Sequence, residues 1–138
     1  MTMERLEIEA TTENLYSVLN FIDEKLEEYE CSMKAQMQID IAVEEIFVNI
    51  ANYAYDKDAP GTAQITIELM QDNMLNITFT DSGIPYDPLT KEDPDVTLNA
   101  EERPIGGLGI FMVKKSMDDM QYRYEDGHNI LTLIKKIA

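Results

Sequence analysis

The sequence predicts an α/β (α+β) sandwich, in which a mixed, largely antiparallel sheet is covered by helices on one face. The chain has 138 residues, 44% of them hydrophobic, which suits a single domain over residues 1–138 with its own core. Five segments alternate apolar and polar residues, as half-buried strands do, and three others have helical patterns. Their order, β-α-α-β-β-loop-α-β-β, is typical of a sheet packed under helices.

The first strand and the first helix are predicted in the N-terminal part of the chain. Apolar side chains alternate with glutamates at residues 6–10, which predicts a short strand. Thr11 and Thr12 follow as candidate caps of a helix. The apolar residues of this helix recur at three- and four-residue spacing: Leu15, Val18, Leu19, Ile22 and Leu26. The other face of this helix carries many of the acidic residues of the chain.

A second, longer helix and a hairpin come next. The helical pattern begins after Ser32, runs to about Tyr55 and ends at the Asp-Ala-Pro-Gly breaker of residues 58–61. Residues 63–69 and 75–79 then alternate strictly around a Gln-Asp-Asn turn. This pattern predicts an antiparallel hairpin with one buried face.

Most of the prolines and glycines fall between residues 83 and 109, which we interpret as a long loop. Long ordered loops in small domains are usually functional, although a disordered connector has a similar composition. A largely buried helix is predicted at residues 108–118. Two closing strands, near 120–124 and 129–137, are joined through Asp-Gly.

The formal net charge of −16 restricts the classes of partner. Proteins that follow nucleic-acid phosphates collect Lys and Arg, so neither direct nucleic-acid binding nor an anionic membrane surface is expected. Cys31 is the single cysteine, which excludes an intramolecular disulfide and fits a reducing cytoplasm. No apolar run approaches the roughly 20 residues that span a bilayer, and no secretory leader is evident.

The second helix carries the first candidate site. Its apolar stripe, which should pack on the sheet, consists of Val43, Phe47, Ile50 and Ala54. Glu45, Asn49 and Asn52 fall within a narrow arc on the opposite side. A carboxylate and an amide oxygen one turn apart suit Mg²⁺, and the carboxylate can also accept a proton from an attacking hydroxyl. The alternative is an ordinary solvated helix face.

The second candidate site lies at the end of the hairpin, where Asp81 and Gly83 follow an alternating strand. The strand end can point an acceptor carboxylate into a pocket, and glycine leaves room for a flat ring to approach the backbone. Asp followed two residues later by Gly is also common turn chemistry. Both interpretations stay open at this point.

The third candidate site is the glycine-rich start of the last predicted helix, residues 103–109. Glycines before a helix leave amide N–H groups free at the positive end of the helix dipole, where an anion can bind. A flexible hinge would have the same composition. The segment is neither a Rossmann nor a P-loop signature, because no strand immediately precedes it and the Gly-Lys-Ser/Thr ending is missing.

Taken together, the three sites resemble the N, G1 and G2 boxes of the GHKL ATPase superfamily in order and spacing. The resemblance covers essentially the whole chain. The Ala-Val-Glu-Glu and Gly-Gly-Leu-Gly-Ile-Phe-Met-Val segments look most like the anti-sigma-factor serine-protein kinases. The resemblance implies a Bergerat-type ATP-binding fold, with ATP and Mg²⁺ as cofactors and a lid at about residues 87–105.

The resemblance also implies a role for each candidate residue. Glu45 would be the general base and Asn49 the ligand of the ATP-associated Mg²⁺, with Asn52 beside them at the nucleotide. Asp81 would bind the adenine amino group. The adenine and phosphate contacts would be completed by Gly83, Gly106, Gly107, Leu108 and Gly109. Arg103 is the basic lid residue nearest these glycines and the candidate for the γ-phosphate contact.

The sequence is compatible with three alternative functions. The first is a serine/threonine protein kinase that phosphorylates a small anti-anti-sigma antagonist and binds a sigma factor; relatives of this kind commonly form homodimers. The second is a nucleotide-gated binding module with little or no transfer, which two departures from the family favour: Tyr53 replaces a histidine of many relatives, and Arg103 stands at a different offset. The third is an acidic interaction protein that binds no nucleotide.

Overall fold

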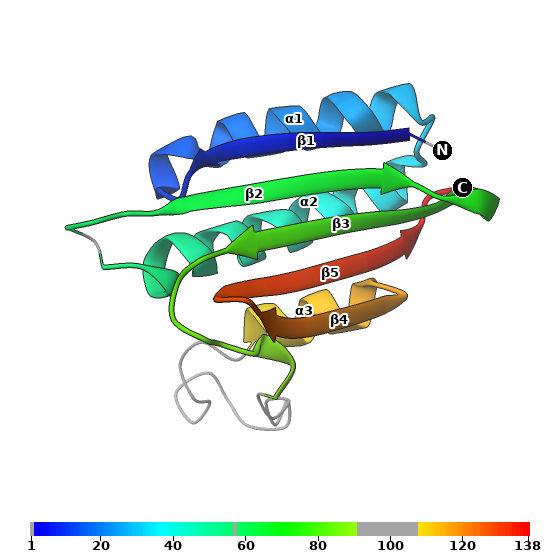
Figure 1. Ribbon diagram of the computed structural model, residues 1–138. Coiled ribbons are helices and arrows are strands. Elements are labelled where there is room, and N and C mark those ends of the chain that lie inside the picture. Colours follow the sequence, from blue (N-terminus) through cyan, green and yellow to red (C-terminus); the bar gives the residue numbers. More distant parts are fainter. Residues whose placement is uncertain (1, 57, 91–107) are drawn as a thin grey trace.

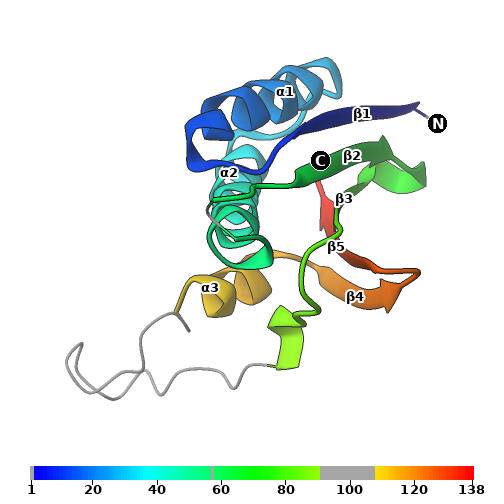
Figure 2. The ribbon, with the colours of Figure 1, turned by 60° about the vertical axis from the view of Figure 1, so that its left-hand side comes forward.

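The computed structural model describes residues 2–56, 58–90 and 108–138. Five strands form one sheet in the order β1-β2-β3-β5-β4, and every pair of neighbouring strands is antiparallel. All three helices lie on the same face of the sheet (Figures 1 and 2). The elements are β1 (Thr2–Glu9), α1 (Leu15–Glu28), α2 (Met33–Asn49), β2 (Thr62–Leu69), β3 (Met74–Asp81), α3 (Leu108–Ser116), β4 (Asp119–Glu125) and β5 (His128–Lys136). The predicted sandwich with helices on one face is confirmed, and its sheet is wholly antiparallel where a mixed sheet was predicted.

The core fills the space between the helices and the inner face of the sheet. Alternate residues of β2, β3 and β5 point into it, which gives the regular buried pattern of these strands. The largest fully buried side chains include Phe47 from α2 and Phe79 from β3. The outer face carries mostly polar side chains, and the hydroxyls of Thr78 and Thr132 lie 3.1 Å apart across two paired strands.

The first strand and the first helix cap differ from the prediction. β1 extends from Thr2 because its main chain pairs with the whole of β2, and an edge strand tolerates exposed charged side chains. Neither Thr11 nor Thr12 caps α1 with its side chain; a 3₁₀ turn precedes the helix instead. The Asn14 Nδ2 atom donates to the Glu9 carbonyl oxygen over 2.9 Å, which fixes this turn.

Helix α2 begins and ends with features that position later parts of the chain. Ser32 is its N-cap, with the side-chain oxygen accepting from the amide of Ala35 over 3.2 Å. At the other end, Ile50–Ala54 continues as a π-helical turn, so the helical region ends where the sequence predicts. The carbonyl oxygen of Ala54 accepts the amide of Ile84 over 3.0 Å. This bond holds the chain after β3 against the end of α2.

Helix α3 packs on α2 and is tied to β5. Ile110 and Val113 are buried in the shared core. The Lys135 Nζ atom donates to the Ser116 carbonyl oxygen over 2.6 Å, which satisfies one of the terminal carbonyls of α3. Within the described ranges, no helix has the length and apolar character needed to cross a membrane.

Candidate active site

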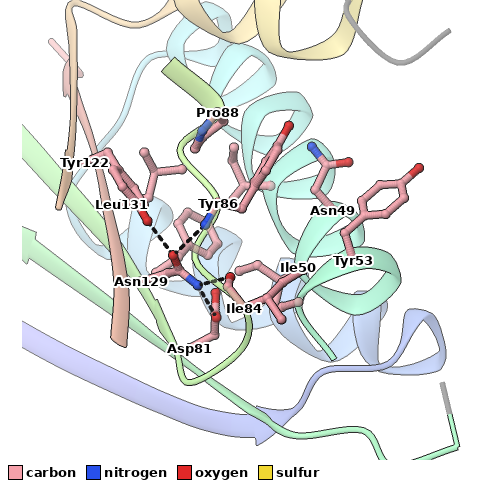
Figure 3. Close-up of a pocket in the computed structure, with 13 residues that line it drawn as sticks. Asn49, Ile50, Tyr53, Asp81, Ile84, Tyr86, Pro88, Tyr122, Asn129 and Leu131 are labelled. Carbon is pink, nitrogen blue, oxygen red and sulfur yellow. Dashed lines mark hydrogen bonds between the residues drawn. The ribbon is translucent and has the colours of Figure 1, made fainter. Parts of the chain in front are cut away.

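A pocket opens where the end of α2 meets the end of β3, and we call it the Asp81 pocket (Figure 3). Its floor comes from the sheet, and its sides come from the π-helical turn after α2 and from the chain after β3. Its lining residues are Ile46, Asn49, Ile50, Tyr53, Ala54, Phe79, Asp81, Ile84, Tyr86, Pro88, Tyr122, Asn129 and Leu131. A mostly apolar pocket with a few polar groups at one end is the usual form of a small-molecule site.

Asp81 is the buried acid of this pocket, with 6% of its surface exposed. One of its carboxylate oxygens, Oδ1, accepts two hydrogen bonds, from the backbone amide of Gly83 and from Nδ2 of Asn129, both over 2.9 Å. The side chain therefore stands at the end of β3 in a fixed orientation and lines the pocket, which is where the sequence prediction placed it.

Asn129 is the pocket residue that sequence reasoning missed. It faces Asp81 across the β3–β5 pairing, is 6% exposed and is one of two buried polar or charged residues in the described part of the chain. The sequence contains a signal for it. Asn129 shares the alternation of Leu131 and Leu133, so it is a polar residue at a core-facing position of the strand.

Gly83 has a steric reason to be glycine. A Cβ atom added here would overlap the carbonyl oxygen of Ala54, the same oxygen that accepts the amide of Ile84. The chain after Asp81 therefore runs directly against the end of α2. Any larger residue would separate the two walls of the Asp81 pocket.

A second hollow, the Glu45 groove, lies between α2 and the start of α3, and its lining residues are Ile41, Glu44, Glu45, Val48, Gly109 and Met112. The Oε1 atom of Glu45 accepts from Nδ2 of Asn49 over 3.3 Å. A Cβ atom on Gly109 would overlap the Glu45 carboxylate, so the glycine lets α3 begin directly at this acid. Since Asn49 also lines the Asp81 pocket, the Glu45–Asn49 pair connects the two hollows.

Among the described residues, Asn52 lines neither the Asp81 pocket nor the Glu45 groove. On a regular α-helix it would lie about 60° from Asn49. The π-helical turn that starts at Ile50 is wider, so each residue advances by less than the α-helical angle and Asn52 rotates away from the Asn49 side. Leu108 is the first residue of α3. Arg103, Gly106 and Gly107 lie outside the described residues, as does most of the predicted lid.

Two tyrosines support the pocket as hydrogen-bond donors. Burial is the main cause that raises the pKa values of Tyr55 and Tyr122 above the usual range, so both hydroxyls keep their protons at neutral pH. The Tyr122 hydroxyl donates to Oδ1 of Asn129. The Tyr55 hydroxyl donates to the Thr62 carbonyl over 2.8 Å and accepts the Ser82 amide over 2.7 Å.

Comparison with known proteins agrees with this geometry. A family model for the histidine kinase-like ATPase domain matches residues 8–135. The serine-protein kinase RsbW of Listeria monocytogenes is 31% identical over 105 residues, which is 72% of this chain and 66% of that protein. The RsbW of Bacillus cereus is 33% identical over 95 residues, which is 66% of this chain and 58% of that protein. This chain thus matches about two thirds or less of the length of these curated relatives.

A solved structure supports the fold. The RsbU and RsbW domains of Rv1364c from Mycobacterium tuberculosis superpose with a TM-score of 0.71 over 99% of this chain and 33% of that chain, at 16% identity. The resemblance to the GHKL superfamily and to the anti-sigma-factor serine-protein kinases is confirmed by these matches. Since the family match extends from β1 to β5, the chain belongs to the family of histidine kinase-like ATPase domains.

Proposed function

We propose that this chain is a serine/threonine protein kinase that transfers the γ-phosphate of ATP to a small anti-anti-sigma antagonist, and that it also binds a sigma factor. The observation that carries the proposal is the Glu45–Asn49 pair, which stands between an apolar pocket ending in an acid and the glycine start of a helix. A purine in the Asp81 pocket would direct its phosphates toward the start of α3.

In this proposal Glu45 acts as the general base. Asn49 occupies its Oε1 atom, and no hydrogen bond from any described residue reaches Oε2. Oε2 can therefore accept the proton of a serine or threonine hydroxyl that enters the Glu45 groove. Phosphoryl transfer requires mainly alignment and charge stabilisation, so the protein needs to supply only one proton acceptor for the attacking hydroxyl.

The amide of Asn49 suits a magnesium ion on the other side of the pair. Its nitrogen points to Glu45, which leaves its Oδ1 atom as an oxygen ligand. The described residues contain no group of three or more His, Cys, Asp or Glu side chains that could hold a metal, so water and phosphate oxygens would complete the shell. Bound magnesium would neutralise charge on the transferring phosphate.

The proposed partners come from the relatives. The curated relatives are serine-protein kinases, and the resemblance implies partner switching between an antagonist and a sigma factor. A homodimer belongs to the same proposal. The strongly acidic chain, with a formal net charge of −16, would attract a basic surface on either partner.

The test is transfer of label from [γ-³²P]ATP to the antagonist protein of the same genome, in the presence of Mg²⁺. Glu45→Gln should lower the transfer rate by roughly a hundredfold or more, with ATP affinity unchanged within about threefold. The matched control is Glu44→Gln, which alters the exposed neighbouring acid in the same groove and should keep the wild-type rate. Equal rates in wild type and Glu45→Gln would remove the base role.

The alternative is a nucleotide-gated binding module with little or no transfer. One observation favours it: Tyr53 lines the Asp81 pocket with 63% of its surface exposed, where many relatives carry a histidine. A neutral phenol cannot supply positive charge at a phosphate. This alternative predicts ATP-dependent binding of the partner without phosphoprotein, and stoichiometric phosphoserine on the partner would eliminate it.

A further inference from the structure

The side chain of Asn129 uses all of its hydrogen-bonding groups at the base of the Asp81 pocket. Its Nδ2 atom donates to Oδ1 of Asp81 over 2.9 Å and to the carbonyl oxygen of Ile84 over 2.8 Å. Its Oδ1 atom accepts from the Tyr86 amide over 3.1 Å and from the Tyr122 hydroxyl. Figure 3 shows these bonds converging on one buried amide from β3, β4 and the chain after β3.

The chemistry of the partners fixes the orientation of this amide. A backbone N–H can only donate and a backbone carbonyl can only accept. Since Tyr86 offers the first and Ile84 the second, exchanging the oxygen and nitrogen of Asn129 would break both bonds. The Tyr86 amide and the Ile84 carbonyl therefore determine that Nδ2 of Asn129, a donor, faces Asp81.

The two oxygens of the Asp81 carboxylate have different hydrogen-bonding partners. Oδ1 takes both N–H donors, from Gly83 and Asn129. No hydrogen bond from the described residues reaches Oδ2, although Asp81 lines the pocket. Two donors on one oxygen prevent the carboxylate from rotating, so Oδ2 remains as one acceptor in a fixed position.

We propose that Asn129 is a positioning residue that makes the Asp81 pocket selective for a purine with an amino group at C6. This proposal rests on the proposed function, because it takes ATP as the occupant of the pocket. A C6 amino group donates to the free Oδ2 atom. A C6 oxo group would place a second acceptor at the position where the amino group donates to the carboxylate.

The same amide also holds the walls of the pocket. Tyr122 belongs to β4, whereas Ile84 and Tyr86 follow β3. Asn129 lies on β5, which pairs with both of these strands, and its side chain forms hydrogen bonds to residues on each side. Removing the Tyr122 hydroxyl leaves both hydrogen bonds donated by Nδ2 of Asn129 in place. This change should therefore weaken the discrimination between C6-amino and C6-oxo purines less than removing the whole amide.

The experiment compares dissociation constants for Mg-ATP and Mg-inosine triphosphate, which has an oxo group at C6, by isothermal titration calorimetry on the full chain. Wild type should prefer ATP by roughly tenfold or more. Asn129→Leu, which is similar in size but cannot hydrogen-bond, should reduce the preference to below about threefold with inosine triphosphate affinity unchanged. Tyr122→Phe should fall between these values.

The matched control is Thr132→Val, which removes a side-chain hydrogen bond from the same strand on the opposite face of the sheet and should keep the wild-type preference. An unchanged preference in Asn129→Leu would overturn the proposal. An equal loss of affinity for both nucleotides would also overturn it, because that result indicates a general structural role. If Asn129→Leu does not fold, Tyr122→Phe decides, and an unchanged preference there overturns the proposal. A wild-type chain that binds neither nucleotide would instead contradict the proposed function.

Discussion

An acid pair between α1 and α2 makes a prediction about the pH dependence of stability. The Oδ1 atom of Asp40 is buried and has no hydrogen-bond partner among the described residues. Burial first, and then a hydrogen bond and the charge of Asp23, raise the pKa of Asp40 from 3.8 to about 7. Gln36 donates to Asp23 over 3.2 Å, which holds the second acid in place. Replacing Asp40 by Asn keeps the shape and removes the titration.

The sign follows from the two proton affinities. The unfolded chain releases the Asp40 proton near pH 4, whereas the folded chain keeps it to about pH 7. The stability contribution is therefore complete below pH 4 and is lost as the pH rises through this window. A shift of about three units corresponds to about 4 kcal/mol. Because Asp40 is only partly buried, solvent screening reduces the expected effect to about 1–2 kcal/mol.

Urea unfolding followed by circular dichroism at pH 5 and pH 8 measures this effect. Asp40→Asn should be more stable than wild type at pH 8 by about 1–2 kcal/mol, and the advantage should shrink by about half or more at pH 5. Glu27→Gln, at an exposed position of α1, is the control and should change stability by less than about 0.5 kcal/mol at either pH. An advantage that is the same at both pH values, or none at pH 8, would refute the reasoning.

Three further substitutions test individual contacts. Tyr55→Phe removes the acceptor of the Ser82 amide and should lower the free energy of unfolding by about 1 kcal/mol in urea. Ser32→Ala removes the N-cap of α2 and should cost about 1 kcal/mol by the same measurement; no change would show that the cap contributes nothing. Gly83→Ala would place a methyl group on the Ala54 carbonyl and should weaken ATP binding tenfold or more by calorimetry. Ser82→Ala is its control, because it keeps the backbone amide that Tyr55 binds, and equal affinities in the two variants would contradict the steric argument.

The fold was largely predictable because its strands and helices have strong periodicity. The alternation of residues 63–69 and 75–79 defines a hairpin that the structure confirms, and the apolar stripe of α2 is buried as expected. The sequence also placed Glu45, Asn49 and Asp81 near the site, since each follows from a local pattern. Their proposed roles at a nucleotide remain predictions.

Features that depend on contacts between distant segments could not be predicted in the same way. The π-helical turn after Asn49 is held partly by the Ala54–Ile84 hydrogen bond, which joins segments 30 residues apart in sequence. Nothing local distinguishes this turn from a regular α-helix, so the position of Asn52 relative to Asn49 could not be predicted from the α-helical angle. Asn129 is different, because its core-facing position in β5 was visible as an exception to the apolar pattern.

The bond from Lys135 to the end of α3 has a mechanical consequence. It anchors the C-terminal end of that helix to the sheet, whereas the other end begins at the Glu45 carboxylate with no side chain on Gly109. Helix α3 is therefore fixed to the sheet at Ser116 and lies close to α2 at Gly109. Between these two ends, Ile110 and Val113 are buried in the core, so this helix is held against the rest of the domain along its whole length.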